Sequence, residues 1–160
     1  MITFLKKLQT SKILLVGVIL ITSCQSNKTD NRNITKDEML QIVKTTDGQF
    51  SIGVLRKEST LLANIYSDSA QYVLPNRTII SGKYKIGKEW AGFVKMKENP
   101  VDIVFSINDV RGNREIIHET GQGYTLLADS TKWNFNYVNV WRLQNDESYK
   151  LDIDTYTPLD

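Results

Sequence analysis

"WNFNYVNVWRLQNDESYKLDIDTY", residues 133–156, holds the pattern that decides the fold of this chain. Side chains two residues apart on a β-strand point to the same side, and residues 133–144 alternate in this way. One face of the predicted strand is aromatic and apolar except for a single amide: Trp133, Phe135, Tyr137, Asn139, Trp141 and Leu143. Turn residues at 145–148 and a second strand pattern at 149–156 predict an antiparallel hairpin whose aromatic face is buried.

Asp152 and Asp154 are two residues apart in the second strand, so a regular strand puts both carboxylates on one face. With a loop of four residues, Asn139 would lie opposite Asp154, and both aspartates would join the aromatic face. An odd-length loop, or a bulge, would instead turn the apolar residues of this strand inward and leave both aspartates beside Arg142. The hydrophobic alternation favours this second arrangement, in which salt bridges explain the carboxylates.

The preceding chain predicts helices first and strands afterwards. Thr35 and Glu38 form a capping-box pattern, and apolar residues at helical spacing continue from there to residue 54. Further helices are expected at 59–66 and 85–96. Strands are expected at 69–76, 77–82, 101–109, 115–127, 133–144 and 149–156.

This order indicates the α+β class: a strongly curved antiparallel sheet with about three N-terminal helices packed over its concave face. Gly121 and Gly123 lie inside one long predicted strand, which points to a bulge or a sharp bend. A curved sheet covered by helices encloses a cavity, and we expect a ligand to bind there.

The N-terminal residues have the pattern of a secretory signal. Three lysines precede a short apolar run at 13–21. "ITSC" at 21–24 resembles the lipobox of bacterial lipoproteins, which implies cleavage before Cys24 and lipidation of this cysteine. We therefore expect a signal at 1–23, the lipidated Cys24 and a flexible tether at 24–35, and a folded domain at 36–160. The resemblance implies membrane attachment in a bacterial cell envelope, with the domain facing the periplasm rather than the cell surface.

Composition excludes several classes of function. Loss of the three lysines of the signal takes the formal net charge from +2 to −1, which leaves no basic surface for nucleic acid. His118 is the only histidine and Cys24 the only cysteine, so zinc sites built from Cys and His and a Cys–His nucleophile are excluded. No glycine-rich nucleotide-binding motif is present, and we expect neither a metal nor a cofactor.

Four segments together resemble a known superfamily: "IYSDSAQYVLPN" (65–76), "ISGKYKIGKEW" (80–90), "HETGQGY" (118–124) and "NVWRLQNDESYKLDIDTY" (139–156). In order and spacing they are similar to the nuclear transport factor 2-like superfamily. The nearest branch is that of the SnoaL-like and ketosteroid-isomerase-like proteins, especially the group called domain of unknown function 4440. The resemblance covers residues 36–156 and implies a cystatin-like cone that forms a homodimer through its sheet. This fold hosts enzymes, ligand binders and assembly domains alike.

The sequence differs from the isomerases at one important position. In those enzymes the aspartate that abstracts the proton directly precedes the proline that ends the first strand. Leu74 holds that place here, before Pro75, and a leucine cannot take a proton from a carbon acid. Steroid-isomerase chemistry is therefore not supported.

Candidate site residues come from the hairpin and from the resemblance. The pocket candidates are Tyr66, Tyr72, Trp90, Tyr137, Asn139 and Trp141. The aromatic members can equally be core residues, whereas a buried amide such as Asn139 needs a partner. Glu119 and Asp154 are the catalytic candidates, because a carboxyl group among apolar walls has a raised pKa. Glu119 can equally be a solvated strand residue.

We expect a lipid-anchored protein whose pocket binds a small, mostly apolar molecule. One alternative is an enzyme of the isomerase, cyclase or dehydratase kind that uses a carboxyl group in the cavity. The other is a dimeric interaction module whose pocket is vestigial, with Val138 and Val140 on the outer face of the sheet.

Overall fold

The computed structural model describes residues 33–159 of the 160-residue chain. The predicted signal, Cys24 and most of the predicted tether lie outside these residues. The elements are α1 (Lys36–Arg56), α2 (Ser59–Ala63), β1 (Tyr66–Val73), β2 (Ile79–Ser81), α3 (Lys83–Phe93), β3 (Pro100–Gly112), β4 (Ile116–Leu127), β5 (Lys132–Leu143) and β6 (Tyr149–Pro158). No helix in this part of the chain is both long enough and apolar enough to cross a membrane.

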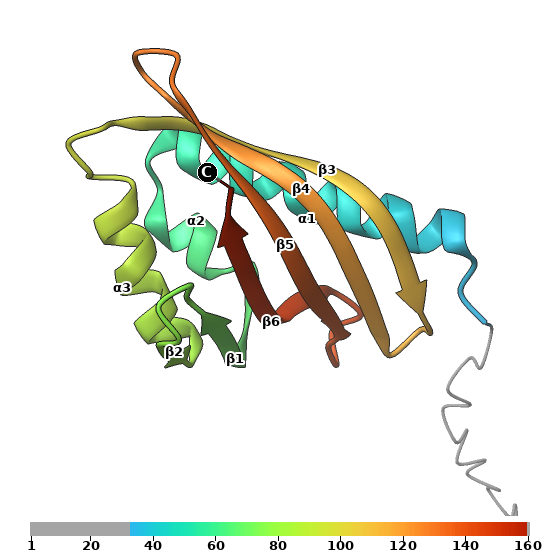
Figure 1. Ribbon diagram of the computed structural model, residues 1–160. Coiled ribbons are helices and arrows are strands. Elements are labelled where there is room, and N and C mark those ends of the chain that lie inside the picture. The colour runs from blue at the N-terminus through green and yellow to red at the C-terminus, as the bar shows by residue number, and fades with distance from the viewer. Residues whose placement is uncertain (1–32, 160) are drawn as a thin grey trace, which may run out of the picture. The chain divides into compact units, whose positions relative to one another are not determined.

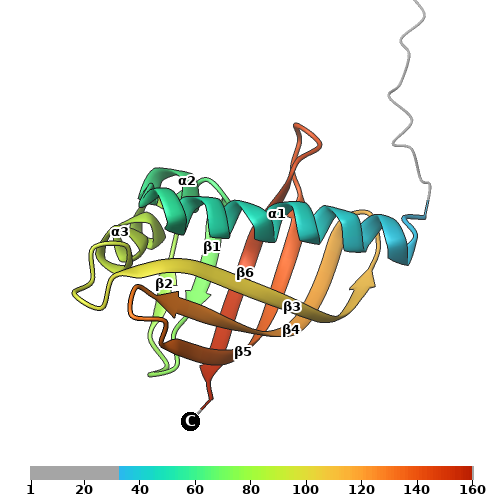
Figure 2. The ribbon, with the colours of Figure 1, turned by 90° about the horizontal axis from the view of Figure 1, so that it is seen from above.

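The six strands form one curved sheet that does not close, in the order β2-β1-β6-β5-β4-β3 (Figure 1). Figure 2 shows α1 lying across the strands, with α2 and α3 at the end of the sheet that carries β1 and β2. The predicted α+β fold, a curved sheet with N-terminal helices, is therefore confirmed. One detail differs from the expectation: β1 pairs with β6 in parallel, whereas the other strand pairs are antiparallel.

The long helix α1 begins and ends where local chemistry allows it. The Thr35 side chain accepts a hydrogen bond from the Glu38 amide at 3.2 Å, and the Glu38 carboxylate accepts one from the Thr35 amide at 2.8 Å, as the capping-box pattern predicts. Lys57 ends the helix in the left-handed conformation, with φ of 56°. Val43, Phe50 and Val54 form the stripe that packs against the sheet.

A bulge in the closing hairpin separates the two aspartates of β6. Near the turn, Trp141 lies opposite Leu151, but the register then shifts by one residue, so that Asn139 lies opposite Asp154. Asp154 consequently points inward and is buried. Asp152 points outward, where Arg142 Nε donates to it at 2.8 Å. Both arrangements considered from the sequence kept the two carboxylates on one face, and that expectation is wrong because Asp152 is itself the extra residue of the bulge.

Gly121 and Gly123 make room for aromatic rings on the concave face. They lie opposite Tyr137 and Phe135 in the ladder between β4 and β5. A Cβ atom on either glycine would stand closer to these rings, and to carbonyl groups of β3, than real Cβ atoms come. β4 itself keeps a regular register with β5, and the irregularity expected here lies across from it, between Ile107 and Asp109 of β3.

Candidate functional site

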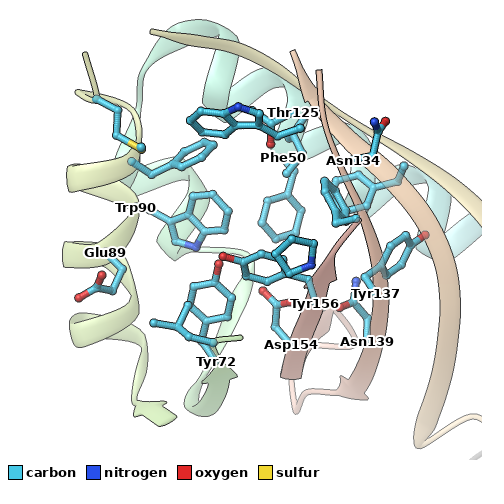
Figure 3. Close-up of a pocket in the computed structure, with 18 of the residues that line it drawn as sticks. Phe50, Tyr72, Glu89, Trp90, Thr125, Asn134, Tyr137, Asn139, Asp154 and Tyr156 are labelled. Atoms are coloured by element: carbon cyan, nitrogen blue, oxygen red, sulfur yellow. The ribbon is translucent and has the colours of Figure 1, made fainter. Parts of the chain in front are cut away.

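A cavity of about 470 Å³ lies between α3, α1 and the concave face of the sheet. About half of the residues that line it are aromatic: Phe50, Tyr72, Trp90, Phe93, Phe105, Trp133, Phe135, Tyr137 and Tyr156. Figure 3 shows Trp90 reaching from α3 toward the side chains of β5 and β6. This volume is within the range of small-molecule sites, and it is not filled by the protein's own side chains.

Polar groups meet at the base of the cavity, where Asp154 and Asn139 lie opposite each other on neighbouring strands (Figure 3). The Tyr66 hydroxyl donates a hydrogen bond of 2.5 Å to Oδ2 of Asp154. Trp90 Nε1 donates to the Tyr66 oxygen at 3.0 Å. This chain of bonds holds the Asp154 carboxyl group in one orientation, so the cavity has a preorganised polar base.

Burial raises the pKa of Asp154 from its ordinary value to about 7. The hydrogen bond from Tyr66 lowers this pKa, and the nearby charge of Glu119 raises it further. The carboxyl group is therefore close to half-protonated at neutral pH, so it can donate or accept a proton.

Glu119 is fully buried behind the wall of the cavity and accepts hydrogen bonds from three side chains of β5. The Tyr137 hydroxyl donates to it at 2.6 Å, Trp141 Nε1 at 2.8 Å and Asn139 Nδ2 at 3.4 Å. Three donors satisfy most of what a carboxylate can accept. Glu119 therefore anchors the aromatic face of β5 from within the core.

Asp47 is a second buried acid in this region, on the inner side of α1. It is 6% exposed, and neither of its oxygens has a hydrogen-bond partner. Burial raises its pKa to about 9, and the nearby charges of Glu119 and Asp154 add to the rise. Asp47 is therefore protonated at neutral pH and carries no charge there.

The residues singled out from the sequence fall into two sets. Tyr72, Trp90, Tyr137, Asn139 and Asp154 line the cavity. Tyr66, Trp141 and Glu119 are not among the residues that line it. All three are fully buried, and their polar atoms are hydrogen-bonded to other buried side chains.

Asp47 is absent from the sequence-based candidates, although a signal for it exists. It follows Val43 by four residues and precedes Phe50 and Val54 by three and seven, so it lies on the apolar stripe of α1. A carboxyl group on such a stripe is buried when the helix packs. Leu74 lines the cavity as well, so the residue that directly precedes Pro75 is an apolar part of its wall.

Between residues 33 and 159, no group of three or more His, Cys, Asp or Glu side chains is placed to hold a metal ion. Asp154 and Glu119 accept hydrogen bonds from hydroxyl, indole and amide groups.

No family pattern matches this sequence, and no curated protein is similar to it in sequence. Solved structures do match its fold. A domain of unknown function with a cystatin-like fold from Nostoc punctiforme has a TM-score of 0.68 and 13% identity, over 79% of this chain and 80% of that chain. An NTF2-like protein from Cytophaga hutchinsonii has a TM-score of 0.62 and 12% identity, over 75% and 98%. A ketosteroid isomerase-like protein from Erwinia carotovora atroseptica has a TM-score of 0.61 and 12% identity, over 78% and 98%. At these identities the likeness establishes the cystatin-like, nuclear transport factor 2-like fold alone.

Proposed function

We propose that this protein binds a small, mostly apolar molecule in the cavity between α3 and the concave face of the sheet. The observation that carries the proposal is the cavity itself, about 470 Å³ with a largely aromatic wall and Asp154 and Asn139 at its base. An apolar body would bury its surface against the rings, and a single polar group would orient it at the base.

Native mass spectrometry tests this proposal. A chain beginning at Asn27 omits the predicted signal and keeps every described residue, including the hydrophobic core that these residues form. We expect this chain to carry a co-purified small molecule, or to take one up from a panel of apolar metabolites. A chain that stays empty against the whole panel would contradict the proposal.

A cavity-blocking variant supplies the matched control. Gly92 lines the cavity from α3, and apart from its chain neighbours and its own helix backbone no atom lies within 4 Å of the place where its Cβ would stand, so Gly92→Trp adds an indole at the wall. Tyr84→Trp places the same side chain on the outside of α3, where Tyr84 is 75% exposed. Binding should be lost in the first variant and kept in the second.

A second candidate function is acid–base catalysis of the isomerase or dehydratase kind. The observation that favours it is the carboxyl group of Asp154, whose pKa of about 7 suits proton transfer at neutral pH. Incubation of a bound ligand with the protein in D₂O tests it by mass spectrometry. Catalysis would be supported if deuterium enters the ligand at a carbon atom, and if Asp154→Asn stops this uptake but still binds the ligand. If no deuterium enters the ligand, catalysis is contradicted and only the binding function remains.

We also propose that the chain is a bacterial lipoprotein of the SnoaL-like branch, held in the cell envelope by lipid on Cys24 and facing the periplasm. The support is the lipobox-like "ITSC" after a basic and apolar leader. Metabolic labelling with a radioactive fatty acid should mark the full chain and not Cys24→Ser. Equal labelling of both would contradict the anchor.

A further inference from the structure

The cavity has an acidic character. Glu89 and Asp154 are among the described residues that line it, and no lysine, arginine or histidine is. Glu89 is exposed on α3, whereas Asp154 is 9% exposed at the base. An anionic ligand would therefore meet carboxyl groups and no counter-charge.

The groups behind the base add to this character. The causes that raise the pKa of Asp47 include the charges of both Glu119 and Asp154, so the three carboxyl groups lie close enough to interact. Glu119 is held by neutral donors, from Tyr137, Asn139 and Trp141. Buried charges in proteins are normally paired, and here no basic side chain is among the groups that act on Asp47 or Asp154.

The free hydrogen-bonding capacity at the base is that of an acceptor. Asn139 is 2% exposed and lines the cavity, and its Oδ1 has no hydrogen-bond partner. Asp154 opposite it accepts from Tyr66 through Oδ2. A ligand that satisfies these oxygens must bring N–H or O–H donors.

Aromatic rings line the same cavity as these acceptors. The rings of Tyr72 and Trp90 stack at 5.9 Å with an angle of 12°, and those of Tyr72 and Tyr156 at 6.1 Å with 27°. The face of an aromatic ring is its negative side, and protein sites for organic cations combine such faces with acidic groups.

We propose that the ligand is a hydrophobic amine, with its protonated nitrogen beside Asp154 and Asn139 and its apolar body among the aromatic rings. This refinement rests on the binding function proposed above. The ammonium group supplies the two things that the base of the cavity lacks. These are a positive charge for the buried carboxyl groups and N–H donors for Asn139 Oδ1. A neutral alcohol supplies only the donor, and a carboxylic acid in its ionised form supplies neither.

The proposal carries a pH dependence. The groups that face or act on Asp154 are Tyr66 and Tyr72 of β1, Glu119 of β4, Asp47 of α1 and Tyr156 of its own strand. None of them is basic, and a bound ammonium would therefore lower the pKa of Asp154 below about 7. Below that pH binding must expel a proton, so amine affinity should rise up to about tenfold per pH unit toward pH 7 and then level off.

Three ligands with one ring system separate the possibilities: 1-naphthylmethylamine, 1-naphthalenemethanol and 1-naphthoic acid. Isothermal titration calorimetry of the full chain at pH about 6 and about 8, where an alkylammonium keeps its charge, measures each affinity. At the higher pH we expect the amine to bind at least tenfold more tightly than the alcohol, and the acid to bind most weakly. Titrations at the lower pH in buffers of different ionisation enthalpy should show that a proton is released.

Two variants with the same chemical change complete the test. Asp154→Asn should abolish the preference for the amine while it retains the alcohol. Asp152→Asn, two residues away and on the outer face with Arg142, should leave all three affinities unchanged. An alcohol that binds as tightly as the amine, or an amine preference that survives Asp154→Asn, would overturn this inference and leave the binding pocket standing. Failure of all three ligands, together with an empty protein in the metabolite panel, would overturn both.

Discussion

The buried carboxyl groups of Asp47 and Asp154 differ in the donors that reach them. Tyr66 donates to Asp154, which limits the rise in its pKa to about 7, whereas no donor reaches Asp47, whose pKa rises to about 9. The two residue types are identical, so the difference comes entirely from the side chains packed around each group.

The pKa of Asp47 makes the stability of the protein depend on pH. Its folded-state pKa is raised, so the folded state favours the proton: this contribution to stability is complete below pH about 4 and is lost as pH rises toward about 9. Asp47→Asn removes this titration, because an amide is uncharged throughout this pH range. We expect the free energy of unfolding of the native protein to fall between pH about 5 and about 8, with up to about 1.4 kcal/mol per unit coming from Asp47, and that of the variant to fall less by this contribution.

Urea unfolding across this pH range measures both slopes. Asp68→Asn is the control, because Asp68 is an exposed aspartate of β1. Parallel pH curves for the native protein and Asp47→Asn would contradict a raised pKa at this residue.

Tyr66 controls the protonation of Asp154. Its hydrogen bond lowers the pKa of that carboxyl group, so Tyr66→Phe should raise it. The variant also leaves Trp90 Nε1 without its acceptor, and we expect a loss of about 1–3 kcal/mol in the free energy of unfolding. A ¹³C NMR titration of the aspartate carboxyl groups measures the pKa. Tyr84→Phe, at an exposed tyrosine, should change neither the pKa of Asp154 nor the free energy of unfolding. An unchanged pKa of Asp154 in Tyr66→Phe would contradict the proposed effect of Tyr66.

At the scale of elements, β4 and β5 depend on a match between glycines and rings. Gly121 lies under the Tyr137 ring and close to the Ser106 carbonyl, so an added methyl group would force the strands or the ring to move. Gly121→Ala should lower the free energy of unfolding by about 1–3 kcal/mol. Gly48→Ala, in α1 where nothing lies within 4 Å of an added Cβ, should raise it by about 0.5–1 kcal/mol. Thermal unfolding of both variants measures these changes in stability. If Gly121→Ala changed the stability no differently from Gly48→Ala, the Tyr137 ring would have moved aside at little cost, which would contradict the prediction.

The elements themselves follow from local sequence. The capping box at Thr35, the helical stripe that continues to Val54, and the alternation along residues 133–144 predict α1 and β5 closely. Helix ends were less well predicted: the expected helix at 85–96 runs from Lys83 to Phe93. Ends depend on packing and on loop contacts, such as those that Lys57 makes with Val94, Asn99 and Pro100, which periodicity does not contain.

At the scale of the whole molecule, the outer face of the sheet carries an exposed apolar strip. Val138 is 45% exposed and Ile153 38%, on neighbouring strands. We predict that this strip is the interface of a homodimer. Val138→Lys should convert the dimer to a monomer in sedimentation equilibrium, since it would bury two like charges. Tyr84→Lys, on the exposed side of α3, should leave it a dimer, and a native chain that is monomeric at every concentration would contradict the prediction.

The sequence by itself determined the class of fold, because periodicity, capping and turn chemistry are local and each element carries its own signal. It also identified the aromatic face of β5, whose single amide, Asn139, lies at the base of the cavity. These signals depend only on which residues share one strand or one helix.

Only the tertiary structure decided which acids lie in the site. The bulge in the β5–β6 hairpin turned Asp154 inward and Asp152 outward, and the packing of α1 on the sheet brought Asp47 to Glu119. The parallel pairing of β1 with β6 placed the Tyr66 hydroxyl against Asp154, across 88 residues of chain. A one-residue shift in register changes the face of every following side chain, and no local pattern encodes it, because its free energy comes from contacts between distant strands.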